Sequence, residues 1–297
     1  MNYNQCNICP RECKVNRLDG KTGFCKETAQ LVVARAALHM WEEPCISGEN
    51  GSGTVFFSGC NMGCVFCQNK NIATGHAGKV ISIHRLEEIF FELKKKGANN
   101  INLVTPTHYM PSIVKAIDQA KEHGFDLPFV YNTGGYEKAE AIRNLEGKID
   151  IYLPDFKYYS ERISTKYSKA PDYFIQANQA LREMVRQQGR AVFDSNGIMK
   201  QGVIVRHLLL PGCLDDSKYI IKYLYENYGD SIYISIMNQF TPLSGLTSHP
   251  EINRTVTKEE YDELVDFAIE IGVENGFIQE GETQLESFIP EFNGEGV

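Results

Sequence analysis

The chain has 297 residues and a formal net charge of −8, from 30 Lys and Arg against 38 Asp and Glu. The acidic balance argues against nucleic acid as a partner, and the 42% of hydrophobic residues exclude a disordered chain. We expect a cytoplasmic protein with no membrane association, because no apolar run approaches roughly 18 residues and the first residues lack the apolar stretch of a signal peptide.

The first 50 residues differ from the rest of the chain. Residues 1–26 are rich in Cys and show little periodicity, and residues 31–40 are interpreted as a strand or a short connector. A Gly- and Ser-rich loop follows. We therefore predict a Cys-rich metal-binding segment with a connector over residues 1–50, and a larger domain over residues 51–297.

The larger domain shows strands alternating with helices. Apolar runs predict strands at residues 54–59, 100–105, 128–133, 149–156, 202–211, 231–237 and 275–279. Helical spacing predicts helices at residues 84–96, 111–123, 136–145, 171–188, 215–228 and 257–271, the last capped by Thr257. This alternation indicates an α/β fold with a parallel sheet that curls into a full or partial barrel. The competing open doubly wound sheet is disfavoured because no G-x-G-x-x-G follows the first strand.

Three cysteines stand together after the first strand of this domain, at Cys60, Cys64 and Cys67. Clustered cysteines in a chain without an export signal are more typical of metal binding than of disulfides. A structural zinc site takes four ligands, and a catalytic one usually includes His or a carboxylate. Three close thiolates without a fourth suit a [4Fe–4S] cluster with one open iron, which an amino-acid-like cofactor could chelate.

Polar residues follow nearly every predicted strand. In a barrel of parallel strands these positions meet at one rim, where active sites lie. Arg206 lies inside its strand instead. The residues at the rim are Thr105, Thr107 and His108 after the second strand, Asn132 and Thr133 after the third, Asp155 and Lys157 after the fourth, and Asn238 and Gln239 after the sixth.

The C-x3-C-x2-C spacing, with the aromatic Phe66 before the last cysteine, resembles the signature of the radical S-adenosylmethionine (SAM) enzymes. The resemblance implies a partial (β/α)6 barrel and a [4Fe–4S] cluster that passes one electron to the sulfonium of SAM. The C5′–S bond then breaks, and a 5′-deoxyadenosyl radical abstracts a hydrogen. Such a cluster is oxygen-labile, which implies an oxidoreductase of anaerobic cytosol with an electron donor such as flavodoxin or ferredoxin.

Residues 50–280 resemble the branch that activates glycyl radical enzymes, typified by pyruvate formate-lyase activating enzyme. That branch carries D-T-N-G after one strand and D-L-K after the next, where this chain has Asn132-Thr133-Gly134-Gly135 and Asp155-Phe156-Lys157. The resemblance implies that Asp155 and Lys157 lie near the ribose and carboxylate of SAM. Asn132 replaces an Asp in a shell where the family places a monovalent cation.

The same resemblance assigns further positions. At two of them this chain differs from the family. Arg206 matches a strand arginine that lines the site. The family's Gly-Gly-Glu motif, which holds the SAM amino group, is replaced by a stretch in which Thr105 and Thr107 supply hydroxyls. Gln239 stands in the region of a histidine near the last SAM contact.

The whole chain resembles a narrower subfamily described as pyruvate formate-lyase activating enzyme-like. It shares the N-terminal C-x2-C-P-R-x-C segment, the V-T-P-T-H-Y stretch and a final run at Ile289-Pro290-Glu291-Phe292. Two activities follow: activation of a glycyl radical enzyme, whose loop would enter the open rim of the barrel, or modification of another peptide or small molecule. A non-catalytic iron–sulfur or zinc protein is the distant alternative.

Four further cysteines stand near the N-terminus, at Cys6, Cys9, Cys13 and Cys25. Four thiolates suit a closed site, which is either a tetrahedral zinc ion or a fully ligated iron–sulfur cluster. Zinc would hold together a segment too small to fold alone, whereas a second cluster could relay electrons. Cys45 is an alternative ligand for this site.

Overall fold

The computed structural model describes residues 2–242, 246–279 and 291–297. Its strands within these ranges are β1 (Leu31–His39), β2 (Ser52–Phe57), β3 (Lys79–Ile81), β4 (Ile101–Val104), β5 (Phe129–Thr133), β6 (Ile151–Pro154), β7 (Val192–Phe193), β8 (Met199–Leu208), β9 (Tyr233–Met237) and β10 (Gly276–Ile278). The α-helices are α1 (Pro44–Ser47), α2 (Lys70–Ala73), α3 (Ile83–Lys95), α4 (Met110–Glu122), α5 (Ala139–Arg143), α6 (Glu161–Ser168), α7 (Tyr173–Gln188), α8 (Leu214–Tyr228) and α9 (Lys258–Glu270).

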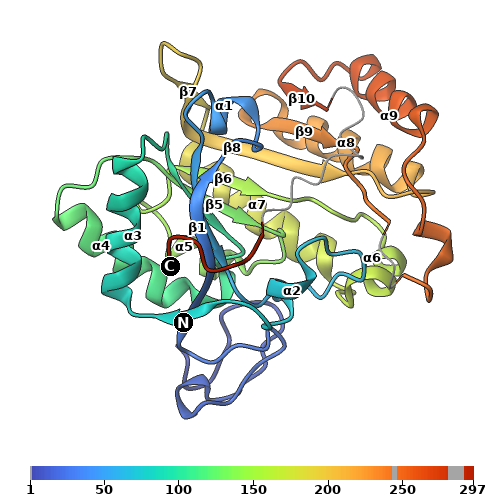
Figure 1. Cartoon of the computed structure of the whole chain (residues 1–297). Helices are drawn as coiled ribbons and strands as arrows, with labels where there is room; N and C mark the ends of the chain where they lie inside the picture. The colour runs from blue at the N-terminus through green and yellow to red at the C-terminus, as the bar shows by residue number, and fades with distance from the viewer. Residues whose placement is uncertain (1, 243–245, 280–290) are drawn as a thin grey trace.

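The strands form one curved sheet in the order β10-β9-β8-β6-β5-β4-β2-β1-β3, with β7 paired to β8. From β2 to β10 every neighbouring pair on this path is parallel. Helices α3, α4, α5, α7, α8 and α9 each lie between two successive strands of this parallel set in the chain, and they pack outside the sheet (Figure 1). This is the predicted α/β architecture of a partial (β/α)6 barrel, and it places the carboxyl ends of the strands at one rim.

The predicted strands and helices of the barrel are present, with boundaries shifted by a few residues. Thr257 is the predicted N-cap of α9, and it forms a capping box with Glu260. The structure adds α6, which the sequence did not predict, and the short elements α1, α2, β3 and β7. These elements are too short, or too dependent on distant partners, to produce a periodic apolar pattern.

The segment interpreted as a strand or connector is strand β1, which pairs antiparallel with β2. His39 lies opposite Ser52, the first residue of β2, so the chain leaves β1 at the amino ends of the parallel strands. Residues near the N-terminus do not form a core of their own, because Cys6 and Ile8 belong to the main hydrophobic cluster. The division of the chain at residue 50 stays a prediction.

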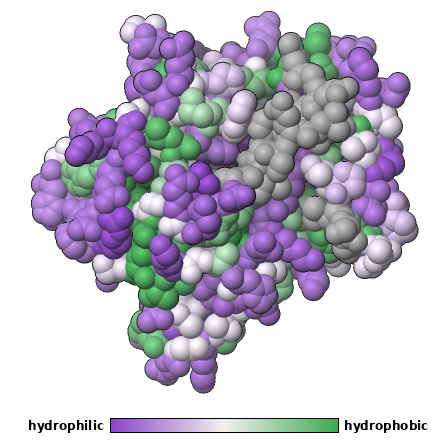
Figure 2. Space-filling view, viewed as in Figure 1, coloured by the Kyte–Doolittle hydropathy of each residue, from purple (hydrophilic) through white to green (hydrophobic). Residues whose placement is uncertain are grey.

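The N-terminal segment projects below the barrel, and the C-terminal residues run back beside β1 (Figure 1). The amide of Ala36 donates to Glu295, and the ring of Phe292 packs on Phe56 with centroids 5.4 Å apart. Of the predicted final run, Ile289 and Pro290 lie outside the described residues. Figure 2 shows hydrophilic residues over the outer helices α3 and α4. Among the helices described, none is long and apolar enough to cross a membrane.

Candidate active site

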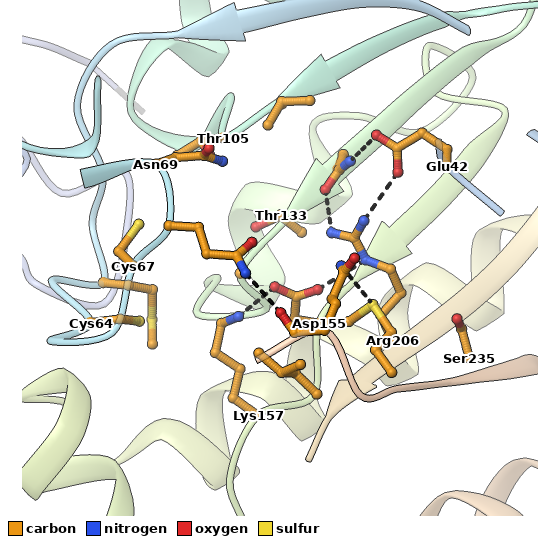
Figure 3. A pocket seen from close by; sticks show the side chains of 18 of the residues that line it. Glu42, Cys64, Cys67, Asn69, Thr105, Thr133, Asp155, Lys157, Arg206 and Ser235 are labelled. Atoms are coloured by element: carbon orange, nitrogen blue, oxygen red, sulfur yellow. Dashed lines mark hydrogen bonds and ion pairs between the residues drawn. The ribbon is translucent and has the colours of Figure 1, made fainter. Parts of the chain in front are cut away.

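A cavity of about 450 Å³ opens at the carboxyl ends of the parallel strands. The loop between β2 and α2 forms one wall, and the ends of β4, β5, β6, β8 and β9 form the wall opposite (Figure 3). The segment between β1 and β2 and the end of β10 complete the lining. Of the residues predicted to form the site, those lining the cavity are Cys60, Cys64, Phe66, Cys67, Thr105, Asn132, Thr133, Asp155, Lys157, Arg206 and Gln239. The residues predicted to meet at one rim of the barrel therefore line a single cavity there.

The cysteine triplet, Cys60, Cys64 and Cys67, lies in the loop between β2 and α2. The Ser168 hydroxyl lies 2.9 Å from Cys64 Sγ, and the Met62 amide 3.4 Å from Cys60 Sγ. Burial first, and then the neighbouring thiols, raise the pKa of Cys60 to about 11 and that of Cys67 to about 12. The thiols of Cys60 and Cys67 are thus protonated at neutral pH, and iron binding has to release their protons.

The triplet fits the donor set of a [4Fe–4S] cluster with one open iron. Three thiols face one cavity, and a hydroxyl and a backbone amide are within hydrogen-bonding reach of two sulfurs. Across the described parts of the chain, no three Cys, His, Asp or Glu side chains are grouped closely enough to hold a single metal ion. A cluster spreads its cysteine ligands over several irons, so its thiols need not converge on one atom.

The N-terminal segment holds the triplet loop from behind. The Arg11 guanidinium donates to the carbonyls of Asn61 and Met62, each at 2.8 Å, and to that of Ser168 at 3.0 Å. At Gly63, where φ is +76°, a Cβ would lie 3.0 Å from the ring of Phe24. The loop therefore needs glycine here both for its backbone conformation and for this close approach.

The wall opposite the triplet is a buried network of charges centred on Asp155. Lys157 Nζ lies 2.5 Å from Asp155 Oδ2, and Arg206 Nε lies 3.0 Å from Oδ1. Burial alone would raise the pKa of Asp155, but the two cations outweigh it and hold this pKa below its usual value. Burial likewise opposes the charge on Lys157, but Asp155 raises its pKa overall. Both side chains are charged at neutral pH, and each is fixed in position.

Arg206 links this network to a carboxylate that the sequence analysis missed. Its Nη1 lies 3.2 Å from Glu42 Oε2, and its Nη2 lies 2.6 Å from Asn132 Oδ1. Glu42 also accepts from Asn102 Nδ2 at 2.8 Å. Asn132 is therefore engaged by Arg206, in the shell where the family places a cation. The local signal for Glu42 was the acidic pair Glu42-Glu43 directly after a predicted strand, in a stretch interpreted only as a loop.

The two threonines expected near the SAM amino group are placed differently. Thr105 lines the cavity with a φ of +57°, a left-handed conformation that is rare for a β-branched residue. Thr107 is buried elsewhere, because its hydroxyl donates to Glu137 Oε1, which also accepts from Thr133. Burial raises the pKa of Glu137 to about 7, although both hydroxyls lower it. The structure therefore brings Thr105 and Thr133 to the cavity but not Thr107.

The N-terminal quartet, Cys6, Cys9, Cys13 and Cys25, gathers away from the cavity. A Cβ on Gly23 would lie 3.1 Å from Cys13 Sγ and 3.9 Å from Cys25 Sγ, so these two sulfurs approach one point. Burial first, and then Glu137, Cys25 and Cys6, raise the pKa of Cys9 to about 12. Cys45 instead packs in a separate apolar cluster inside the barrel, so the structure does not bring it to the quartet.

Comparisons with known proteins agree with this geometry. A sequence model of the radical SAM superfamily matches residues 54–194. The chain is 30% identical over 275 residues to the uncharacterized protein MJ0674 of Methanocaldococcus jannaschii, covering 90% of this chain and 75% of that protein. The match to the superfamily model spans the triplet, Thr105, Asn132, Asp155 and Lys157. The chain belongs to the radical SAM superfamily, which implies a [4Fe–4S] cluster and SAM as cofactors.

Two solved structures have the same fold over three quarters of this chain. One is SuiB of Streptococcus suis bound to its precursor peptide SuiA, with 12% identity, a TM-score of 0.50, and coverage of 75% of this chain and 47% of that one. The other is the FeFe-hydrogenase maturase HydG from Carboxydothermus hydrogenoformans, with 14% identity, a TM-score of 0.50, and coverage of 75% and 52%. The chain spans about half the length of each, and at these identities they show the fold alone.

Proposed function

We propose that the protein is a radical SAM enzyme that cleaves SAM reductively and uses the 5′-deoxyadenosyl radical to abstract a hydrogen from a substrate. The observation that carries this proposal is that three cysteine thiols face one cavity opposite a fixed pair of charges, Asp155 and Lys157. When bound, the cluster supplies one electron to the sulfonium of SAM, which leaves methionine and the 5′-deoxyadenosyl radical. The chain's own residues hold SAM, orient it and shield the cavity from water.

The roles of the lining residues follow from their charges. Lys157 is a point charge suited to the SAM carboxylate, and Asp155 can accept from the ribose hydroxyls. Arg206 is a positioning residue, because it holds Asp155 and Asn132 in place. Thr133 and Gln239 lie on the same cavity, and Phe66 packs on Phe240 at 5.8 Å beneath the triplet loop. Where the family has Gly-Gly-Glu, this chain offers the Thr105 hydroxyl to the SAM amino group. Thr107 would reach SAM only if its hydrogen bond to Glu137 broke.

A second metal site at the N-terminal quartet is part of this proposal. The Phe24 amide donates to Cys13 Sγ at 3.2 Å, and hydrogen bonds of this kind commonly orient the ligands of a metal site. Four thiols suit either a tetrahedral zinc ion or a fully ligated iron–sulfur cluster at this site. A cluster here would be an electron relay from a donor such as flavodoxin or ferredoxin, since the segment packs directly behind the triplet loop.

The substrate is either a glycyl radical enzyme or another peptide or small molecule. The open rim of the partial barrel suits a protein loop, which favours the first. The replacement of Gly-Gly-Glu and the extra N-terminal cysteines favour the second. Glycyl-radical electron paramagnetic resonance (EPR) on a lyase incubated with the reduced protein and SAM distinguishes them. A glycyl radical supports activation, and its absence on all lyases tested favours the alternative. We expect the enzyme to work in anaerobic cytoplasm.

The direct test is 5′-deoxyadenosine formation by anaerobically reconstituted protein with SAM and dithionite. We expect 5′-deoxyadenosine and methionine in equal amounts. Cys213→Ala is the matched control, because Cys213 is a half-buried cysteine at the start of α8, outside the cavity. This variant should keep the activity. Iron-loaded wild-type protein that forms no 5′-deoxyadenosine would contradict the proposal.

A further inference from the structure

The floor of the cavity is built by the segment between β1 and β2. Because β1 runs antiparallel to β2, this segment crosses the amino ends of the parallel strands, and α1 is anchored there. Asn100 Nδ2 donates to the Ile46 carbonyl at 2.8 Å, and Asn99 Nδ2 donates to that of Ser47 at 2.6 Å. Cys45 and Ile46 pack in an apolar layer inside the barrel with Val130, Ile151, Leu153, Met199 and Ile204.

Glu42 and Glu43 precede α1 and line the cavity next to this apolar layer. Glu42 is paired, through Arg206 and Asn102. Glu43 is 91% buried, and burial raises its pKa, while the nearby Arg206 and Ser235 side chains lower it. Its Oε2 has no hydrogen-bond partner among the residues that the structure describes. One carboxylate oxygen on the cavity floor is thus buried and unsatisfied.

Among the described residues that line the cavity, carboxyl groups outnumber Lys and Arg side chains. The lining carboxylates are Glu42, Glu43 and Asp155, while the lining Lys and Arg side chains are Lys157 and Arg206. Lys157 is paired with Asp155, and Arg206 forms ion pairs with Asp155 and Glu42 and is also close enough to lower the pKa of Glu43. His39 also lines the cavity, but burial lowers its pKa and keeps it neutral. Two cationic side chains thus face three carboxyl groups among the described lining residues. Burial raises the pKa of Glu43 although Arg206 lowers it, and a cationic ligand beside Oε2 would lower this pKa again and satisfy that oxygen.

We propose that Glu43 and Ser235 form a subsite for a cationic nitrogen group, an ammonium or a guanidinium, on the substrate. Figure 3 shows Cys64 and Cys67 on one side of the cavity and Ser235, Arg206 and Glu42 on the other. The cationic end of the substrate therefore binds at the floor, and the rest of the substrate extends toward the side where SAM would bind. This inference rests on the proposed function, because it assigns the substrate class of the same cavity.

The test compares pentylammonium with 1-pentanol, which has the same chain length and no charge. Calorimetric titration of the full-length reconstituted protein, saturated with SAM, gives the affinity for each probe. We expect pentylammonium to bind at least about tenfold tighter than 1-pentanol, since a buried charge pair commonly contributes more than this. In Glu43→Gln this preference should disappear, and in Ser235→Ala it should fall in part. Glu49→Gln, an exposed position on the same segment, is the matched control and should keep it.

Equal affinity of the wild-type protein for the two probes would overturn the inference, as would an undiminished preference in Glu43→Gln. A tenfold loss of SAM affinity in Glu43→Gln with the probe preference intact would also overturn it, and would assign Glu43 to the amino group of SAM. Failure of the proposed function is seen separately, as wild-type protein that binds pentylammonium selectively but forms no 5′-deoxyadenosine.

Discussion

The cysteine triplet and the N-terminal quartet differ in what surrounds their sulfurs. The triplet faces a cavity with fixed charges on its far wall, whereas the quartet is packed behind the triplet loop and away from that cavity. Three thiols leave a cluster open to a ligand, and four close it. The comparison teaches that the number of cysteines and their access to a cavity together separate a site for chemistry from a site for structure or electron transfer.

The largest effect is expected from the triplet. Alanine at Cys60, Cys64 or Cys67 should lower 5′-deoxyadenosine formation at least about 100-fold, because a missing ligand removes the open cluster. The rate is measured by chromatography. It should fall together with the iron content, which should drop by about four irons per chain. Retained SAM cleavage in any of the three variants would show that the triplet is not the site of the chemistry, and the contrast with the quartet would fail.

Changes in the quartet should affect stability more than chemistry. In Cys13→Ser, loss of the closed site should cost about 3 kcal/mol and lower Tm by roughly 10 °C. Differential scanning calorimetry and metal analysis of the same sample check this. The metal lost identifies the site, because zinc and iron are counted separately. If Cys13→Ser abolished SAM cleavage while Tm and metal content stayed unchanged, the quartet would not be the closed site.

The contact between the two regions depends on Arg11. Arg11→Ala should speed the loss of iron from the triplet to a chelator roughly tenfold, because two carbonyls of the triplet loop, and that of Ser168 at the end of α6, lose a charged donor. Iron release is followed by absorbance under anaerobic conditions. Arg190→Ala, at an exposed position outside the cavity, is the control. Equal release from both variants would show that the N-terminal segment does not support the loop.

A smaller effect, a pH dependence of stability, should come from His108. This residue lies between the N-terminal segment and the end of β2, near the triplet loop. The Nε2 of His108 lies 2.6 Å from the Ser58 carbonyl, and the Arg17 guanidinium donates to the backbone carbonyl of His108. Burial first, and then Arg17, lower the pKa of His108 to about 3, whereas the unfolded chain has a value near 6.5. The folded state keeps the ring neutral, so stability is full above pH 6.5 and falls as the pH drops toward 3.

Between pH 7.5 and 5.5, His108 alone should lower the free energy of unfolding by about 1.4 kcal/mol. Urea unfolding midpoints of the wild-type protein and His108→Gln at both pH values measure this. The variant should show the smaller drop, because glutamine keeps a donor for Ser58 and does not titrate. An equal drop in both proteins would place the pH dependence elsewhere.

The barrel and the triplet could be predicted from the sequence because both depend on local patterns. The apolar runs define strands, and C-x3-C-x2-C lies within one loop. Glu42 and Glu43 could not be placed, since their position depends on β1 pairing antiparallel with β2. Thr107 was assigned to the cavity because it follows a strand, but its hydroxyl bonds to Glu137 instead. Such long-range pairings leave no periodic signal in the chain.

The central claim, that the triplet holds a cluster open at one iron, is tested most directly by EPR of the dithionite-reduced protein before and after SAM is added. We predict that the signal of the triplet cluster shifts on SAM binding, and that the shift is absent in Cys64→Ala. Any signal from the quartet should stay unchanged. A triplet signal that SAM leaves unaltered, in protein with its full iron content, would contradict the account.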